Sequence, residues 1–318
     1  MLRYVLNRFI YLIPVLFFMS LIVFSFIHLI PGDPVDYMLG FEATDQARVA
    51  VRQELGLDRN ILVQYGSWAG KLLTGDFGKS IVSRKPVLSL ILEKFPATLV
   101  LAIAATTVAV FLGLLFGTFA ASRRNSAMDL AALTLALFWV SIPSFWLGIL
   151  LILLFSLTFP IFPSMGYGSI LNNFLNGLYY LALPAFTLGA VEAGALTRMT
   201  RAEMIEQLGK DYVVTAMAKG LPRRVVIYKH ALRNSLIPVV TFIGLQLGTL
   251  LGGTVVVEQI FAWPGVGRLV IEAIFARDYP MVQGIVLFYA VIFIVVNLLV
   301  DISYTFLNPQ IRLGRSGA

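Results

Sequence analysis

The stretch that decides the fold is residues 130–191, which read LAALTLALFWVSIPSFWLGILLILLFSLTFPIFPSMGYGSILNNFLNGLYYLALPAFTLGAV. These 62 residues contain no charged side chain. A helix needs about 20 apolar residues to cross the hydrocarbon core of a bilayer, so the run has room for two crossings. Proline, glycine and asparagine gather between Pro160 and Asn176, where no single helix is expected to continue. The stretch therefore predicts two membrane-spanning helices joined by a turn.

The composition of the whole chain agrees with a membrane location. Hydrophobic residues make up 58% of the 318 residues and charged residues 13%, against roughly a quarter charged in ordinary globular proteins. This excludes a cytosolic enzyme, a disordered chain and a fibrous repeat. The chain has no cysteine and only two histidines, His28 and His230, so no thiolate or histidine metal site is expected.

Four further charge-free runs cover residues 9–32, 95–122, 234–257 and 279–300. The alternating segments of about ten residues that mark transmembrane strands are absent. The sequence therefore predicts an all-α integral membrane protein. Its six transmembrane helices are expected at about 9–30, 96–121, 129–158, 178–199, 236–257 and 282–306.

These helices divide the chain into three predicted parts. Residues 1–32 form an N-terminal anchor helix, because the apolar run is longer than the ~7–15 residues of a signal peptide. Residues 33–95 form an extracytoplasmic region with short helices, one from Thr44 or Asp45 to Leu55-Gly56 and one from about Ile61 to Gly75. Residues 96–318 form a five-helix core, with a cytoplasmic loop at about 200–234 and an extracytoplasmic loop at about 258–281.

The distribution of lysine and arginine sets the orientation. With the N-terminus inside, the inner segments carry a net charge of +10 and the outer segments −1, while Glu192 and Asp301 lie within spans near their inner ends. Both termini are therefore predicted to be cytoplasmic. The positive net charge of the chain is explained by the lysines and arginines of its inner segments, so no nucleic-acid partner is expected.

One short segment, Gly75-Asp76-Phe77-Gly78-Lys79-Ser80, looks like a phosphate-binding loop. The phosphate loop needs a glycine five residues before its second glycine, and that position is Leu73. The predicted topology also places the segment outside the cell. It is interpreted as a turn, so any ATPase that drives this protein is a separate subunit.

The most specific feature is the segment from Asp211 to Pro222. Asp211 can cap a helix and Gly220 can end it, with Pro222 just beyond. A helix of eight residues is about 12 Å long, too short to be stable alone in water. Two interpretations remain open at this point: docking on another protein, or lying on the inner headgroups. A stripe at four-residue spacing continues from the preceding helix: Met204, Leu208, Tyr212 and Ala216.

The same segment carries a resemblance to a known family. The string Asp211-Tyr212-Val213, Thr215-Ala216, Ala218-Lys219-Gly220-Leu221, with His230-Ala231-Leu232-Arg233-Asn234 after it, is similar to the cytoplasmic loop of permeases of the dipeptide/oligopeptide/nickel family of ABC importers. Further matching motifs are Pro31-Gly32-Asp33-Pro34, Phe261-Ala262-Trp263-Pro264-Gly265-Val266-Gly267-Arg268, Arg277-Asp278-Tyr279-Pro280, Asn297-Leu298-Leu299-Val300-Asp301 and Asn308-Pro309. The chain resembles the first permease subunit, the dipeptide permease B type, and the type I importer fold is implied. Val214 and Thr215 depart from the glutamate and alanine of the general loop pattern, which leaves any salt bridge there in doubt.

This resemblance implies a multi-pass protein of the bacterial plasma membrane and a set of partners. They are a homologous second permease, two cytoplasmic ATPases that bind ATP and magnesium, and an extracytoplasmic binding protein. This chain itself would hold no cofactor. The resemblance also implies a coupling helix that docks on an ATPase through Asp211, Tyr212, Thr215, Ala216, Ala218, Lys219, Gly220 and Leu221.

Two further groups of residues are candidates for function. An amide that faces lipid is costly, so Gln246, Thr249, Gly253 and Ser141 are candidates for the translocation path. The outer motif supplies candidates for docking of the binding protein, namely Trp263, Pro264, Gly265 and Arg268. A second stripe, Gly244, Gly248 and Gly252, is expected to serve close helix packing.

The expected substrates are dipeptides and oligopeptides, with nickel chelates or glutathione as alternatives. A secondary transporter or channel is the competing class, and it would transport without an ATPase. A membrane enzyme would need a nucleophile and base or a metal cluster in the spans, and the sequence offers neither.

Overall fold

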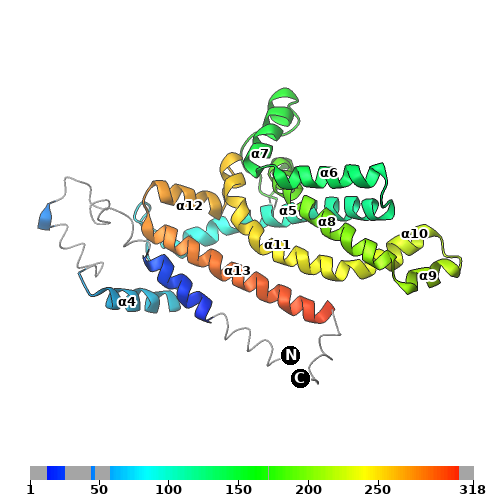
Figure 1. Cartoon of the computed structure of the whole chain (residues 1–318). Coiled ribbons are helices and arrows are strands. Elements are labelled where there is room, and N and C mark those ends of the chain that lie inside the picture. Colours follow the sequence, from blue (N-terminus) through cyan, green and yellow to red (C-terminus); the bar gives the residue numbers. More distant parts are fainter. Residues whose placement is uncertain (1–12, 26–43, 47–57, 171, 308–318) are drawn as a thin grey trace, which may run out of the picture. The chain divides into compact units, whose positions relative to one another are not determined.

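The computed structural model describes residues 13–25, 44–46, 58–170 and 172–307. Within these residues every named element is helical, and strand pairing is limited to an isolated bridge between Lys79 and Pro86. The predicted all-α fold is confirmed. A helix at Ile13–Ser25 precedes the labelled elements. These are α4 (Ile61–Leu73), α5 (Val87–Ser122), α6 (Ala127–Ser141), α7 (Ser144–Ile152), η1 (Leu153–Thr158), α8 (Phe174–Leu208), α9 (Asp211–Ala218), α10 (Arg223–Val225), η2 (Val226–Ala231), α11 (Leu232–Ile260), α12 (Val266–Phe275) and α13 (Tyr279–Leu307) (Figure 1).

The long apolar helices coincide with the predicted spans. Four continuous helical stretches are long and apolar enough to cross a membrane: Val87–Ser122, Phe174–Leu208, Arg223–Ile260 and Tyr279–Val300. Of the first predicted span, the structure describes only Ile13–Ser25, and the remainder lies outside the described residues. Of the two short helices expected before residue 76, α4 confirms the second, while most of the first lies outside the described residues.

The third predicted span, 129–158, is not one helix. The chain forms α6 and then α7 with η1, and the two parts are bent by 101°. The cause is Pro143, which has no backbone N–H and disfavours the helical conformation of the residue before it. Ile142 is accordingly extended, with ψ 126°, and Pro143 becomes the N-cap of α7. Figure 1 shows α7 turning away from the line of α6.

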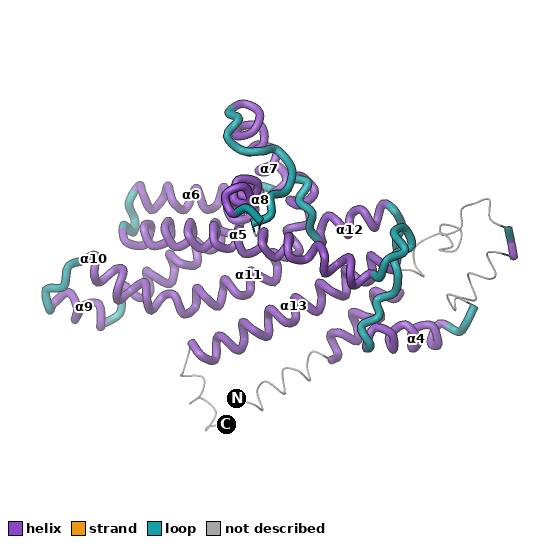
Figure 2. The backbone as a smooth tube through the Cα atoms, turned by 180° about the vertical axis from the view of Figure 1, so that it is seen from behind, coloured by secondary structure: helices purple, strands orange, loops and turns teal. Residues whose placement is uncertain are grey.

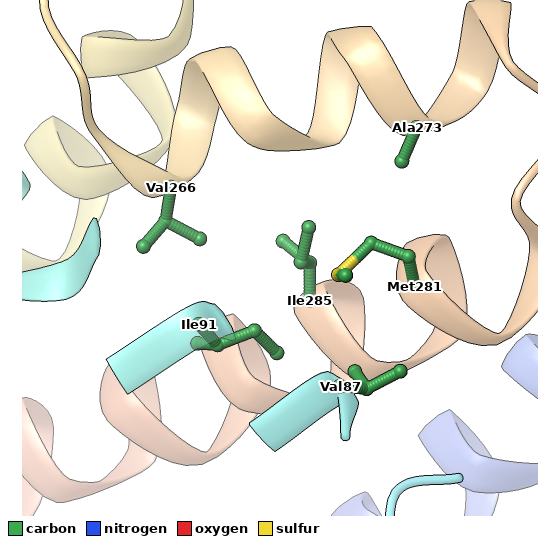
Figure 3. Packing of buried hydrophobic residues seen from close by; sticks show 6 residues of the cluster. All are labelled: Val87, Ile91, Val266, Ala273, Met281 and Ile285. Carbon is green, nitrogen blue, oxygen red and sulfur yellow. The ribbon is translucent and has the colours of Figure 1, made fainter. Parts of the chain in front are cut away.

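The chain divides into two compact units. Unit 1 comprises residues 1–96 and 265–294, and unit 2 comprises residues 97–264 and 295–318, so that α5 and α13 contribute to both. Residues 265–294, assigned from the sequence to the five-helix core, thus group with the N-terminal part. The reason is a buried apolar cluster in unit 1 (Figure 3), built from Val87, Ile91, Val266, Ala273, Met281 and Ile285.

The segment that resembles a phosphate loop is a turn in unit 1, held by Asp278. The Ser80 hydroxyl donates to one carboxylate oxygen of Asp278 at 2.5 Å, and the backbone N–H of Ile81 donates to the other at 3.1 Å. Gly75 and Gly78 both have φ +80°, which glycine adopts at little cost. Ser80 is therefore used in a structural bond, and Lys79 is exposed.

In unit 2, α8 is packed closely between its neighbours. A Cβ added at Gly194 would lie 2.4 Å from the carbonyl oxygen of Ala136 on α6. One added at Gly189 would lie 2.6 Å from the carbonyl oxygen of Ala105 on α5. Only a bare backbone fits at these two crossings, so α5, α6 and α8 pack closely together.

Of the glycine stripe of α11, Gly244 and Gly248 are buried and Gly252 is exposed. A Cβ at Gly244 would meet Val300 of α13 at 2.5 Å, whereas Gly252 has no atom within 4 Å of that position. The prediction of close packing therefore holds for Gly244, and Gly252 lies on an open face.

Candidate functional site

The short helix α9 lies in the α8–α11 connection (residues 209–231), at the end of unit 2 where α5 turns into α6 (Figures 1 and 2). The predicted stop at Gly220 is present, with φ +78°. It lets the N–H of Gly220 reach the carbonyl of Met217 at 2.9 Å. The predicted cap at Asp211 is wrong by one residue, because Lys210 occupies the N-cap and Asp211 begins the helix. A carboxylate in the first turn still interacts favourably with the helix dipole.

One face of α9 packs against its own chain. Val213 is 1% exposed and Ala216 8% exposed, and they form a cluster with Val226, which Leu208 and Tyr212 also contact. The resemblance to the permease family implied that Ala216 contacts an ATPase. The structure instead places this methyl group inside the connection, because the chain after Pro222 folds back onto α9.

The predicted continuous stripe from Met204 to Ala216 is also interrupted. Helix α8 ends at Leu208, and the chain turns through Gly209. Met204 accordingly belongs to a separate buried cluster with Ala121, Ile227 and Ala231. Leu208 contacts both clusters, which joins α9 to the end of α8.

The opposite face of α9 is open. Val214 is 63% exposed and Met217 49% exposed, and Leu221 follows at 38%. The other exposed members of the predicted coupling set are Asp211, Thr215, Ala218, Lys219 and Gly220. The short helix thus presents a mixed apolar and polar surface, while Tyr212 is half-buried and hydrogen-bonded through its hydroxyl to Gln207 at 3.0 Å.

An ion pair braces the helix that leads to this connection. Arg201 on α8 donates from Nε and from a terminal nitrogen to the two carboxylate oxygens of Asp129 on α6, at 2.6 and 2.7 Å. The backbone N–H of Asn125 also donates to Asp129 at 2.9 Å. The Asp129 side chain is only 5% exposed. The bidentate pair therefore fixes the start of α6 against α8. Sequence reasoning missed it, since the two residues are 72 positions apart.

A polar contact lies inside the helix bundle of unit 2. Gln246 on α11 donates from Nε2 to the carboxylate of Glu192 on α8. Both line a cavity of about 20 Å³ that also includes Thr106 of α5, a volume that fits one water molecule. Glu192, which the sequence places within a span near its inner end, thus has as its partner an uncharged amide on a neighbouring helix.

The other candidates for the path lie on exposed surface. Thr249 and Gly253 are exposed on α11, and Ser141 is exposed at the end of α6. The Thr249 hydroxyl donates to the carbonyl of Gln246 at 2.9 Å, so its polarity is satisfied within its own helix. Of the four, the structure brings Gln246 and Thr249 together and leaves Ser141 on a separate element.

The candidates for binding-protein docking separate into buried and accessible residues. Trp263 is fully buried, and its indole N–H donates to the carbonyl of Ala97 at 2.9 Å. Gly265 is also buried, so neither residue can contact a partner directly. Pro264 and Arg268 are partly exposed, and Arg268 bonds Glu272 on α12 at 2.8 Å.

The end of α12 shows a residue that the sequence analysis did not single out. Phe275 is 84% exposed. A large apolar side chain in that position is a candidate contact for a partner. Its signal in the sequence is the helical spacing of α12, which places Val266 and Ala273 inward and Phe275 on another face.

Comparisons with known proteins cover nearly the whole chain. Residues 113–313 match the family described as "Binding-protein-dependent transport system inner membrane component". Residues 1–102 match the N-terminal part of such membrane components. The "Glutathione transport system permease protein GsiC" of Escherichia coli (strain K12) is 44% identical over 312 residues, which are 98% of this chain and 99% of the relative. The protein of that name from Salmonella typhi gives the same figures.

A solved structure shows the same fold. The chain is similar to one in "Inward facing conformations of the MetNI methionine ABC transporter", with a TM-score of 0.56 and 17% sequence identity. The match covers 70% of this chain and 97% of that one. Together with the long apolar helices, these matches establish what the sequence motifs predicted: the chain belongs to the family of inner membrane components of binding-protein-dependent transport systems, as the permease of an ABC importer.

Proposed function

We propose that this permease forms half of the translocation path for small peptides, with glutathione, itself a tripeptide, as the first substrate to test. The observation that carries the proposal is 44% identity over 98% of the chain to a permease named for glutathione transport. Dipeptides and longer oligopeptides belong to the same chemical class, with a free ammonium and carboxylate and polar amides between them.

The polar contact between Glu192 and Gln246 supports a place for these residues on the path. A carboxylate inside a membrane helix is costly unless it has a role or a partner. Here its partner is an amide, which can also exchange its hydrogen bond with a peptide group. Thr249 and Gly253 continue the same helix, and Ser141 is proposed to face the path from α6. The second half of the path would come from a homologous second permease.

The exposed face of α9 is proposed as the contact with an ATPase. Closure of two cytoplasmic ATPases on ATP and magnesium would push on this face, and α8 would carry the displacement into the membrane. Val214 and Leu221 supply apolar area for that contact. This assignment makes both chain termini cytoplasmic and places the protein in the bacterial plasma membrane. The accessible residues of α12 (Arg268, Phe275) then face a substrate-binding protein outside.

Uptake of labelled glutathione, a labelled dipeptide and a nickel chelate into cells that lack their own systems tests the substrate. The assembled system of two permeases, ATPases and the cognate binding protein should take up at least one of the two peptides in an ATP-dependent way. Uptake of the nickel chelate alone would overturn the peptide assignment. A matched measurement is ligand binding to the isolated binding protein, which reports substrate choice independently of this chain.

The path assignment has its own test in Glu192→Gln and the control Thr106→Val. Both change the lining of the same cavity, but only the first removes the carboxylate. Glu192→Gln is expected to change the Michaelis constant for substrates with a free ammonium group more than for an N-acetylated peptide. An equal effect on both substrates contradicts a path role for Glu192.

A further inference from the structure

A groove of about 350 Å³ lies at the end of unit 2 where the α8–α11 connection meets the turn between α5 and α6. All of its lining residues belong to unit 2. Helix α5 ends at Ser122, and its charge-free run ends at the same residue. A change from apolar to charged residues at a helix end marks the level of the lipid headgroups. The groove therefore lies at one membrane–water interface.

The charges on this groove are all of one sign. Its charged lining residues are Arg123, Arg124 and Arg223, and no acidic residue lines it. Arg223 is held in place by donating to the carbonyl of Ser122 at 2.8 Å. Arg123 lies over the ring of Phe119, 4.9 Å from its centre. The guanidinium groups of Arg223 and Arg123 are thus oriented by these contacts. Arg123 and Arg124 are exposed to solvent.

The remaining lining is mostly apolar. Ile205 and Leu208 come from the end of α8, and Ile227 comes from η2. A soluble anion would bind the arginines and leave this apolar surface exposed to water. An amphiphile with an anionic head would use both, because guanidinium groups bind phosphate oxygens in pairs and a hydrocarbon chain gains from covering apolar area.

We propose that this groove binds an anionic phospholipid of the cytoplasmic leaflet. The phosphate lies among Arg123, Arg124 and Arg223, and an acyl chain runs along Ile205 and Leu208, which are partly exposed. Basic pockets between transmembrane helices on the cytoplasmic side suit anionic headgroups in this way. The inference rests on the orientation in the proposed function, which makes this end of the bundle cytoplasmic.

Binding at this place has a consequence for coupling. The groove is lined from α5, from α8 and, through Met217 and Arg223, from the α8–α11 connection that carries α9. A lipid that contacts all three braces the connection against the bundle. Anionic lipid is therefore expected to raise substrate-stimulated ATPase activity as well as to bind.

The test uses the purified complex of permeases and ATPases, delipidated and then titrated with phosphatidylglycerol or phosphatidylcholine. Retained lipid is counted by native mass spectrometry, without substrate or ATP. Wild type is expected to retain phosphatidylglycerol in preference to phosphatidylcholine. The groove variant, Arg123→Gln/Arg124→Gln/Arg223→Gln, is expected to bind phosphatidylglycerol at least about tenfold more weakly, as each lost cation near a membrane surface weakens binding several-fold.

A matched control removes the same charge from nearby positions outside the groove, two in the α8–α11 connection and one at the start of α11: Arg224→Gln/Lys229→Gln/Arg233→Gln. These three side chains are exposed and do not line the groove. The control is expected to keep the wild-type preference for phosphatidylglycerol. The single variant Arg124→Gln, at an exposed turn position, gives an intermediate loss and guards against misfolding of the triple variant.

Three outcomes overturn the proposal. They are equal retention of both lipids by wild type, equal weakening by the groove and control variants, and displacement of the lipid by inorganic phosphate at matched concentration, which would make the groove a free-phosphate site. Since no readout needs substrate or transport, a failure here is distinct from a failure of the peptide assignment.

Discussion

Replacing Gly220 by valine is expected to lower substrate-stimulated ATP hydrolysis and transport together. Gly220 ends α9 with φ +78°, and this conformation directs two N–H groups back into the helix. The N–H of Gly220 bonds the carbonyl of Met217 at 2.9 Å, and that of Leu221 bonds the carbonyl of Ala216 at 3.3 Å. A residue that leaves the left-handed region would break this arrangement and redirect the chain.

The size of the effect follows from the backbone alone. A Cβ at Gly220 would have no atom within 4 Å, so the substitution causes no clash. The cost is that of holding an L-residue in the left-handed region, about 1–2 kcal/mol. A shift of that size changes the ratio of the native to the alternative conformation of the connection by about 5- to 30-fold. The transmembrane helices are unaffected, because the substitution lies outside them.

Reconstituted vesicles containing the complete importer provide the assay. Uptake and substrate-stimulated ATPase activity are expected to fall together, by at most about 5- to 30-fold, while the amount of assembled complex stays normal. The control Tyr228→Val places a valine at a 61% exposed position of the same connection, where φ is not positive, and should behave as wild type. If Gly220→Val keeps both activities at the level of this control, α9 does not couple the ATPase to the spans.

Three further predictions follow from the described residues. Arg201→Gln leaves the buried Asp129 carboxylate unpaired and is expected to destabilise the complex by about 3 kcal/mol, and Asp129→Asn leaves the partly exposed Arg201 unpaired and is expected to cost less. Thermal unfolding should show that the double variant loses little more than Arg201→Gln alone, and additive losses would contradict the pairing. Lys79→Ala is expected to leave ATP binding and uptake near wild type, because Lys79 is an exposed turn residue, and a large drop in ATP binding by the complex would refute this. The chain has no cysteine, so an impermeant thiol reagent on intact cells should label Arg59→Cys and spare Ala318→Cys, whereas labelling of position 318 would reverse the proposed orientation.

The apolar helices and the end of α9 could be predicted because their causes are local. Apolar runs without charge need a bilayer, and glycine at position 220 permits a conformation that other residues adopt only at a cost. The bend at Pro143 also has a local cause, because proline interrupts a helix. The size of the bend could not be predicted, because α7 is oriented by distant contacts: its Gly148 lies against Phe261, where an added Cβ would come within 3.3 Å.

Two residues of the candidate site are also placed by distant contacts that the sequence does not show. Trp263 lies in a motif with proline and glycine that is typical of an exposed loop. Its indole N–H nevertheless donates to the carbonyl of Ala97, which is 166 residues away in the sequence. Ala216 has the small side chain expected at a protein contact, and the fold uses it against Val226 instead. A single sequence shows which residues can approach closely, and long-range packing decides what they approach.

Helix α8 connects the two parts of the proposed mechanism. It is continuous from Phe174 to Leu208, so Glu192 lies about 24 Å from the α8–α11 connection at 1.5 Å per residue. Arg201 fixes α8 to Asp129 of α6 through a buried bidentate pair, which costs about 3–5 kcal/mol to break. The contact from α8 to α11 at Gln246 is a single hydrogen bond, worth about 1–3 kcal/mol with a charged partner. Helix α8 also packs along α11, and α9 packs against Val226 of η2, which is continuous with α11. A push on α9 is therefore expected to reach α6, α8 and α11, and to act on the polar contact between Glu192 and Gln246 from both of its helices, which is the contact proposed for the path.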